Sequence, residues 1–272
     1  MSQHEVVRTR GGALAMRSLE AGEVMHPGVG PLVEAEQLYV RQSRLAERLS
    51  AAEGSTLVVF DVGLGAGSNA LAARAASERL PQGAARLELV SFERDLGALA
   101  LALDNGDAFG WRGEPAEAAR ALLERGAHET PRTRWRLERG DVLAALAREA
   151  SRAAVIFWDP FSPRANPGLW TVAAFAAALR CAGPRCALYT YSASTATRLA
   201  MLLAGWAVGT GDAIGEKAET TAAAVLARDL TRPLDQRWLA RLARSDAPRP
   251  SDAPADAVAR AHAAPQFGPP TR

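Results

Sequence analysis

The sequence contains no long apolar run, few cysteines and a single lysine. No uninterrupted apolar stretch approaches the roughly 20 residues that a membrane-spanning helix needs. Met1–Gly12 is polar and has no apolar run behind its arginines, which argues against secretion. Cys181 and Cys186 are too few for a disulfide framework or a zinc site of four thiolates, which favours a reducing compartment. We therefore expect a cytoplasmic protein without a membrane segment.

Charge and composition exclude further classes. The 32 basic and 30 acidic residues leave a net charge of +2, whereas a protein that coats nucleic acid through charge alone is usually far more basic. A local arginine cluster could still hold a phosphate backbone. With 48% hydrophobic and 23% charged residues, the chain is typical of globular proteins rather than disordered ones. We expect no metal site, because the histidines lack the spacing of metal ligands and are scattered as His4, His26, His128 and His262.

Composition divides the chain into three parts. Residues 1–30 form an N-terminal extension, in which a hairpin around Gly11-Gly12 is one option. Residues 31–243 carry the regular apolar patterning and form the expected domain. Residues 244–272 are mostly Ala, Pro, Asp and Arg, a composition that buries too little apolar surface to offset the entropy of ordering. We expect this last part to be a disordered tail.

Within the domain, short β-branched runs alternate with longer Ala/Leu-rich stretches, which predicts β-α-β units and a mainly parallel sheet. The strands are expected at Thr56–Val62, Leu87–Glu93, Trp135–Arg139, Ala154–Asp159, Cys186–Ser192, Trp206–Gly211 and Ala222–Arg228. The helices are expected at Pro31–Ser50, Ser68–Leu80, Leu96–Asn105, Glu114–Arg125, Val142–Ala150, Thr171–Cys181 and Thr195–Leu203. This order predicts an α/β fold with a doubly wound, mostly parallel, seven-stranded sheet.

The most informative segment runs from Asp61 to Asn69 and reads Asp-Val-Gly-Leu-Gly-Ala-Gly-Ser-Asn. It follows an apolar strand and opens a helix, so its glycines would let the backbone approach a ligand at the helix N-terminus. A tight turn without a ligand is the alternative. An acid before the first glycine and a second acid, Glu93, at the end of the next strand favour a ligand, because a carboxylate there can bind both hydroxyls of a ribose.

The acid in the loop separates two cofactor classes. A dinucleotide fingerprint has a third glycine at the sixth position, which is Ser68 here, and a pyrophosphate disfavours a nearby carboxylate. Asp61 with its three glycines instead resembles the first motif of class I methyltransferases, which implies a Rossmann-like fold and S-adenosylmethionine. Asp141 follows the third strand, where these enzymes place an acid against the adenine, although a helix cap is equally consistent. The expected cofactor-binding residues are Asp61, Gly63, Gly65, Gly67, Asn69, Glu93 and Asp141.

A proline-rich loop makes the resemblance specific. The fourth strand ends in Asp159-Pro160-Phe161-Ser162-Pro163, and this segment resembles the acidic motif of the MnmC-type methyltransferase domain. That family methylates the aminomethyl group on a wobble uridine of tRNA. Three further segments resemble it in the same order, and they are the leader Glu23–Pro31, the glycine loop with Asn69, and Gly215–Thr221. The resemblance therefore implies a methyltransferase that acts on tRNA, in a stand-alone form without the flavin oxidoreductase half.

Two departures from the family pattern concern the substrate side. Fuller members read Asp-Gly-Phe-Ala-Pro at the acidic motif, and a basic run of that family is reduced here to Lys217. Asp159 remains able to accept a hydrogen bond and a proton from an amine held in line with the methyl–sulfur bond, although it could be a loop-capping residue. Phe161 could stack on a flipped base or belong to the core, and Arg164 could contact RNA or be a solvated arginine.

We thus expect an S-adenosylmethionine-dependent N-methyltransferase with Asp159 as its catalytic residue and with Phe161, Arg164 and Lys217 binding substrate. One alternative keeps the enzyme but has a small-molecule or protein amine as acceptor. Another is a non-catalytic cofactor-binding or RNA-binding module. The last alternative would be disfavoured if Asp159 and Glu93 faced one cavity, because a decayed enzyme has no reason to hold two carboxylates there.

Overall fold

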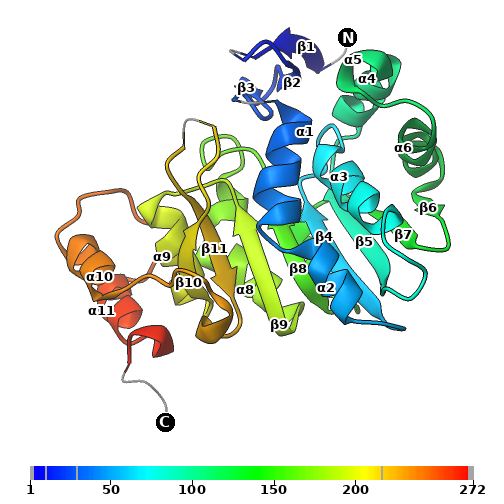
Figure 1. The fold of residues 1–272 in the computed structure, drawn as a ribbon. Helices are drawn as coiled ribbons and strands as arrows, with labels where there is room; N and C mark the ends of the chain where they lie inside the picture. Colours follow the sequence, from blue (N-terminus) through cyan, green and yellow to red (C-terminus); the bar gives the residue numbers. More distant parts are fainter. Residues whose placement is uncertain (1–2, 10, 29, 216, 269–272) are drawn as a thin grey trace.

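An eight-stranded sheet runs through the middle of the molecule, with helices on both faces (Figure 1). The computed structural model describes residues 3–9, 11–28, 30–215 and 217–268. In spatial order the strands are β10 (Ala207–Gly211), β11 (Thr220–Ala224), β9 (Ala182–Thr190), β8 (Ala153–Trp158), β4 (Thr56–Val62), β5 (Arg86–Glu93), β7 (Thr133–Arg139) and β6 (Ala127–Glu129). The five central strands β9, β8, β4, β5 and β7 are parallel, whereas β11 and β6 run antiparallel to their neighbours.

Two apolar cores lie on the two faces of this sheet. One is covered by α1 (Pro31–Glu34), the π-helix η1 (Ala35–Arg41), α2 (Leu45–Ala51), α3 (Ser68–Glu78), α4 (Gly97–Asp104), α5 (Gly106–Phe109) and α6 (Glu114–Arg125). The other is covered by α7 (Val142–Arg148), α8 (Val172–Arg180), α9 (Thr195–Leu203), α10 (Gln236–Ala243) and α11 (Ala257–His262). Short 3₁₀ turns complete the described chain at η2 (Pro167–Trp170), η3 (Ala227–Asp229) and η4 (Pro265–Phe267).

The register of the central strands brings three chain segments to one edge. Val62 pairs with Phe92 on one side and with Trp158 on the other, so β5, β4 and β8 end at the same level. Their apolar side chains are buried on both faces, as a parallel strand between two helical layers requires. The glycine loop, Glu93 and Asp159 therefore meet at the carboxyl edge, where open α/β sheets bind ligands.

The α/β architecture is confirmed, while two details of the prediction are wrong. The sheet has eight strands rather than seven, because β6 adds a three-residue antiparallel edge that is too short to show a strand period. The single helix expected over residues 31–50 is divided, since η1 follows α1 as a π-helix and Arg44 takes a positive φ of 53° before α2. The periodicity of apolar residues encodes neither the short edge strand nor the break in the helix.

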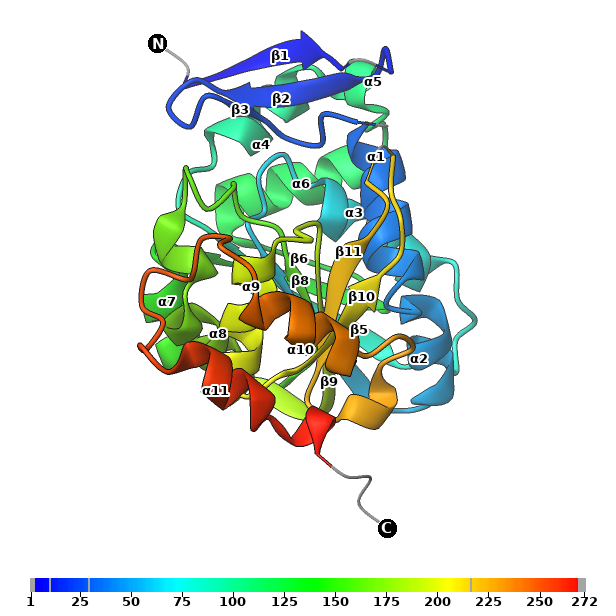
Figure 2. The same cartoon turned by 90° about the vertical axis from the view of Figure 1, so that its left-hand side faces the viewer.

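A small antiparallel sheet, called here the N-terminal sheet, is formed by β1 (His4–Arg8), β2 (Leu14–Ser18) and β3 (Glu23–Val24). It lies across one end of the molecule and packs on α4 (Figure 2). The turn between β1 and β2 contains Gly12, which has a positive φ of 83°. The hairpin left open by the sequence is thus present, and it covers the carboxyl edge of the main sheet.

The expectation of a disordered tail is wrong. Residues 245–268 pack on the second face of the sheet, where α11 buries Ala257 and Ala261 against neighbouring helices. Gln266 accepts a hydrogen bond from the backbone N–H of Val208 and donates one to its carbonyl, and Asp252 accepts from the first amides of α8. Alanine methyl groups and polar caps hold the segment, and a scan for large apolar residues overlooks both.

Three expectations about local chemistry can be compared with the described residues. Cys181 and Cys186 are buried and form no disulfide, as packing residues do. No helix in the described ranges is long and apolar enough to cross a membrane. Within the same ranges, no group of three or more His, Cys, Asp or Glu side chains is arranged to hold a metal ion.

Candidate active site

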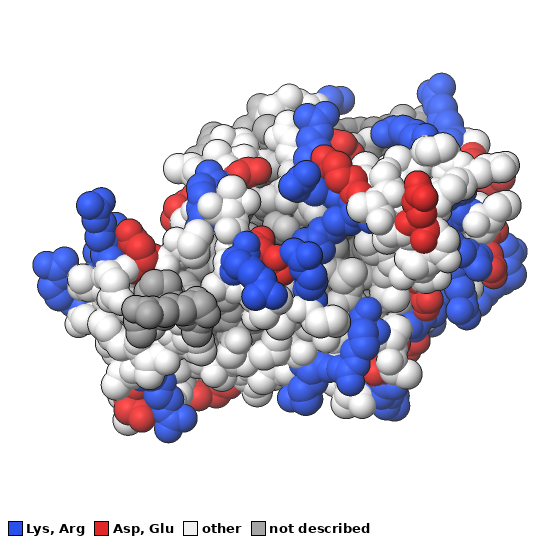
Figure 3. All heavy atoms as spheres, turned by 60° about the horizontal axis from the view of Figure 1, so that its bottom comes forward, with Lys and Arg blue, Asp and Glu red and all other residues white. Residues whose placement is uncertain are grey.

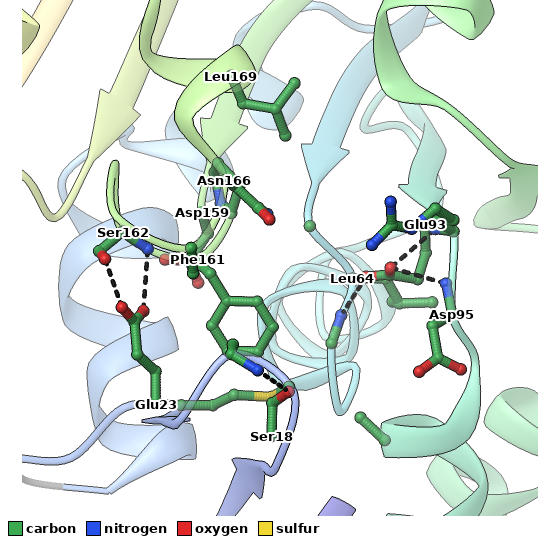
Figure 4. Close-up of a pocket in the computed structure, with 18 of the residues that line it drawn as sticks. Ser18, Glu23, Leu64, Glu93, Asp95, Asp159, Phe161, Ser162, Asn166 and Leu169 are labelled. Atoms are coloured by element: carbon green, nitrogen blue, oxygen red, sulfur yellow. Dashed lines mark hydrogen bonds between the residues drawn. The ribbon is translucent and has the colours of Figure 1, made fainter. Parts of the chain in front are cut away.

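A cavity of about 1050 Å³ opens at the carboxyl edge of the sheet, between the main sheet and the N-terminal sheet. Figure 4 shows its two sides, with Asp159 and Phe161 on one side and Leu64, Glu93 and Asp95 on the other. Much of the wall comes from residues within 18–27, 63–66, 92–95 and 159–169, and further parts come from His4, Glu34, Ala98, residues 140–143, Tyr191 and Lys217. Asp159 and Glu93 therefore face one cavity, which disfavours a non-catalytic module.

The glycine loop has the backbone that its sequence predicts. Gly63 and Gly65 have positive φ angles of 88° and 53°, a region that only glycine adopts readily. A Cβ on Gly63 would lie 2.8 Å from the Asp159 carbonyl oxygen, and one on Gly65 would lie 3.1 Å from the Met25 sulfur. Gly67 also has a positive φ but does not line the cavity, since a Cβ there would meet Leu99 of α4 at 3.1 Å. Two glycines thus shape the cavity and the third permits helix packing.

Asp61 lies beneath the loop rather than at the cavity wall. Its Oδ2 accepts a hydrogen bond of 2.7 Å from the Ser91 hydroxyl, and Ser91 in turn accepts one of 2.9 Å from the Trp135 indole. The buried Oδ1 has no partner among the described residues. Burial raises the pKa of Asp61 to about 7, the Ser91 hydrogen bond opposes this, and the negative charges of Asp159 and Glu93 add to it.

Glu93 and Asp141 both line the cavity and both bind backbone amides. Glu93 accepts hydrogen bonds from the N–H groups of Gly65 at 3.0 Å, Arg94 at 2.8 Å and Asp95 at 3.0 Å (Figure 4). Asp141 accepts 2.8 Å from the N–H of Ala144 and so caps α7, which is the alternative that the sequence allowed. Glu93 thereby ties the glycine loop to the end of β5, and its position beside Gly65 suits a ribose.

Asp159 follows β8 and is held by Asn69. The Asn69 amide nitrogen donates a 2.7 Å hydrogen bond to Oδ2 of Asp159. Asn69 is buried and does not line the cavity, so the structure places it behind the acid rather than against a cofactor. Burial raises the pKa of Asp159, while the His26 charge and the hydrogen-bonding groups of Tyr39 and Asn69 oppose the rise.

His26 and Glu34 complete this corner, and sequence reasoning missed both. The His26 Nε2 lies 3.7 Å from Asp159 Oδ2, and its Nδ1 lies 3.8 Å from Glu34 Oε1. Both side chains are about nine-tenths buried. The histidines lack the spacing of metal ligands, and no periodicity in the sequence indicates that the loop before α1 lies beside the end of β8. The only available signal was that His26 falls within a leader segment that resembles the family.

The proline-rich loop is tied to the N-terminal sheet. Glu23 of β3 accepts hydrogen bonds from the Ser162 backbone N–H at 3.0 Å and from its hydroxyl, and it pairs with Arg164 at 3.4 Å. Phe161 lines the cavity, and its carbonyl accepts from the Trp170 indole at 2.8 Å. Trp158, at the end of β8, is fully buried. Arg164 is 75% exposed beside the cavity and remains available to a substrate.

Lys217 lines the cavity on the side that carries Asp159. Its Nζ is 4.4 Å from the centre of the Tyr191 ring, a cation–π distance, and both residues line the cavity. The Tyr191 hydroxyl donates to the Pro160 carbonyl at 3.0 Å. The three expected substrate-side residues are therefore at one cavity, on the side that carries Asp159.

These residues fit S-adenosylmethionine. The absent side chains of Gly63 and Gly65 leave a concave backbone surface that a Cβ would fill, and Glu93 and Asp141 place two carboxylates on the same wall. The volume lies at the upper end of the range for cofactor and ligand sites. Asp61 and Asn69 support this wall from behind.

Comparisons with known proteins agree with the site. Residues 117–225 match a family model described as S-adenosyl-L-methionine-dependent methyltransferase. A tRNA 5-methylaminomethyl-2-thiouridine biosynthesis bifunctional protein MnmC from Pseudomonas aeruginosa is 31% identical over 209 residues, which are 73% of this chain and 32% of that protein. The MnmC of Methylibium petroleiphilum is 30% identical over 231 residues, which are 80% of this chain and 34% of that protein. The chain thus spans about a third of the length of the curated relatives it matches.

Solved structures give the same result. The crystal structure of MNMC2 from Aquifex aeolicus superimposes with a TM-score of 0.72 and 25% identity, covering 90% of this chain and 77% of that one. A probable spermidine synthase from Corynebacterium glutamicum has a TM-score of 0.50 at 14% identity, with 93% and 94% covered, which supports the fold alone. Fold, site and family model together define a class I, S-adenosylmethionine-dependent methyltransferase. Within that class, the chain belongs with the MnmC-type methyltransferase domains.

Proposed function

We propose that this chain transfers a methyl group from S-adenosylmethionine to the nitrogen of an aminomethyl group on a modified wobble uridine of tRNA. The carrying observation is that Asp159 shares one cavity with the glycine loop and Glu93, with its backbone in contact with Gly63. The printed names of the MnmC relatives supply the tRNA nucleoside. The proposal includes action in the cytoplasm, where tRNA is modified.

Binding of the cofactor is assigned to one wall of the cavity. When bound, S-adenosylmethionine supplies a methyl group activated by a sulfonium. The Gly63–Ala66 backbone would hold its amino-acid end, Glu93 would accept from its ribose hydroxyls, and Asp141 would face its base. Asp61 and Asn69 act from behind, because they fix the loop and Asp159 without reaching the cavity surface.

The opposite wall is assigned to the acceptor. Its amine must present a neutral lone pair to the methyl group, so an N–H bond breaks, an N–C bond forms and the C–S bond breaks. Asp159 accepts the hydrogen bond that orients the amine and takes its proton, and a carboxylate in a largely buried corner favours a cationic acceptor. Phe161 would stack on the base, while Arg164 and Lys217 would contact phosphate or base.

Nucleoside analysis tests the proposal directly. The protein is incubated with isotopically labelled S-adenosylmethionine and with tRNA carrying 5-aminomethyl uridine, and the digested nucleosides are identified by mass spectrometry. We expect label only in the 5-methylaminomethyl nucleoside, with no label in tRNA that lacks the aminomethyl group. If cofactor binds but tRNA stays unlabelled while free polyamines or protein amines become labelled, the acceptor is a different amine.

A further inference from the structure

A largely buried histidine stands between two largely buried carboxylates at one side of the cavity. His26 approaches Glu34 through Nδ1 at 3.8 Å and Asp159 through Nε2 at 3.7 Å. Both contacts are slightly longer than hydrogen bonds, a spacing that often tightens when an active site is occupied. Neither His26 nor Glu34 is used by the chemistry described so far, and burying three ionisable groups together is costly unless they compensate one another.

The backbone holds His26 there in an unfavourable conformation. Its φ of 53° lies in the left-handed region, which residues with a side chain rarely occupy. The backbone N–H of Met25, just before His26, donates to the Met16 carbonyl of β2 at 2.7 Å, and the Met25 sulfur lies against Gly65. Outliers of this kind persist when the surrounding structure requires them, and they concentrate at functional sites.

The titratable groups around His26 and its two carboxylates come from several elements. Glu34 ends α1, Asp61 lies in β4, Asp159 follows β8 and Lys217 precedes β11, while Tyr39 of η1 and Tyr191 after β9 lie near the carboxylates. Burial by itself lowers the pKa of His26, but Glu34 and Asp159 outweigh both burial and the Lys217 charge, so the pKa is raised. The tyrosines stay neutral, because burial and the nearby carboxylates raise their pKa values.

We propose that His26 is a positioning residue whose imidazolium, held by Glu34, keeps Asp159 ionised in this largely buried corner so that Asp159 can take the proton of the acceptor amine. This inference rests on the proposed function. In the step itself, an ammonium N–H bond breaks and an O–H bond forms on Asp159, which leaves the nitrogen lone pair for the methyl group. The product then carries the positive charge lost by the sulfonium, and Asp159 returns its proton to solvent.

A pH–rate profile separates this role from a structural one. His26→Asn removes the positive charge, so we expect the acidic limb of kcat to move up by about one pH unit, with a roughly tenfold loss near neutral pH that is largely recovered at high pH. His262→Asn, at an exposed position on α11, is the matched control and should follow the wild type. A loss that is equal at every pH, or an unmoved limb, would overturn the inference.

Histidine NMR gives a second test that needs neither tRNA nor turnover. The His26 imidazole resonance is identified by its absence in His26→Asn, and its pKa is then followed in wild type, Asp159→Asn and Glu34→Gln. We expect the pKa of His26 to fall in both carboxylate variants. An unchanged His26 pKa would refute the coupling, even if tRNA methylation is observed. Absence of methylation with the coupling intact would instead count against the proposed function.

Discussion

The two ends of the central sheet carry charge in opposite ways. At the amino end, arginines whose side chains reach the surface pair with carboxylates, as Arg86 does with Glu129 and Arg185 with Asp229. Figure 3 views the molecule from the end away from the N-terminal sheet and shows basic side chains mixed with acidic ones. At the carboxyl end, Asp61 is buried, Asp159 is about nine-tenths buried, and both have raised pKa values.

The charged groups at the amino end are compatible with the fold, whereas those at the carboxyl end are expected to serve a functional site. Exposed ion pairs are screened by water and contribute little to stability. Buried carboxylates lose hydration and destabilise the fold unless neighbouring groups compensate them. Several buried carboxylates with shifted pKa values at one sheet edge therefore indicate a functional site. Substitutions at the two ends should therefore have very different effects.

The largest effect is expected for Asp159→Asn. The amide keeps the shape and the Asn69 neighbour but cannot take a proton, so the methylation rate should fall by about 10²-fold or more. Cofactor affinity, measured by calorimetry, should stay within about twofold of the wild type. A rate within a few-fold of the wild type would make Asp159 a loop-capping residue instead.

Glu93→Ala should mainly weaken cofactor binding. The variant loses the charge-assisted hydrogen bonds proposed for the ribose and also the hydrogen bond that fixes Gly65. We therefore expect the affinity for S-adenosylmethionine to fall by about ten- to a hundredfold. Calorimetric titration with S-adenosylmethionine measures this. Glu124→Ala, on an exposed face of α6, is the matched control. Equal affinities for the two variants would remove Glu93 from the cofactor wall.

The C-terminal segment offers an intermediate case, because it packs through apolar burial and caps rather than through charge. Ending the chain after Arg244 removes α11 and the two hydrogen bonds between Gln266 and Val208. We expect the melting temperature to fall by more than about 5 °C. An unchanged melting curve would show that residues 245–268 do not pack on the body in solution, contrary to the structure.

A smaller, pH-dependent effect is expected at Asp61. Its folded-state pKa of about 7 lies above the ordinary value of 3.8, so between these pH values the folded protein retains a proton that the unfolded chain has released. Stability from this group therefore falls as pH rises through that window. Asp61→Asn, which cannot ionise, should gain about 2–4 °C in melting temperature over wild type at about pH 8 and less at about pH 5. A gain that does not vary with pH would contradict the shift.

The smallest effect is expected at the amino end. Arg185 pairs with Asp229 at 2.5 Å, but its side chain is largely exposed. Arg185→Ala should change the melting temperature by less than about 2 °C and leave the methylation rate unaltered. A change as large as that of the truncated chain would abolish the contrast between the two ends of the sheet.

Sequence reasoning succeeded where structure is encoded locally. The bounds of β4, α6 and α9 agree with the prediction residue for residue, because apolar periods and flanking signals mark them. Glycines stand on both sides of α6, and Ser194 caps α9. The convergence of the glycine loop and Asp159 on one cavity followed from the rule that parallel strands share a carboxyl edge.

It failed where structure depends on tertiary packing. His26 was judged by its spacing along the chain, whereas its neighbours Glu34 and Asp159 reach it only through a helix and a distant strand end. Asn69 was assigned to the cofactor by resemblance, but it points at Asp159. The C-terminal segment was expected to be disordered from a composition count, although small side chains and polar caps are enough to hold α11.

The contact between Gly63 and the Asp159 carbonyl links the two halves of the reaction mechanically. With only a hydrogen on Cα, the turn after β4 rests directly on the backbone that follows β8, closer than any side chain would permit. The proposed donor and acceptor sites are therefore set at a fixed spacing by main-chain packing. Adaptation to a different acceptor would then be expected in the N-terminal sheet and the proline-rich loop, since altering the spacing itself would require replacing Gly63, where a side chain would meet the Asp159 backbone.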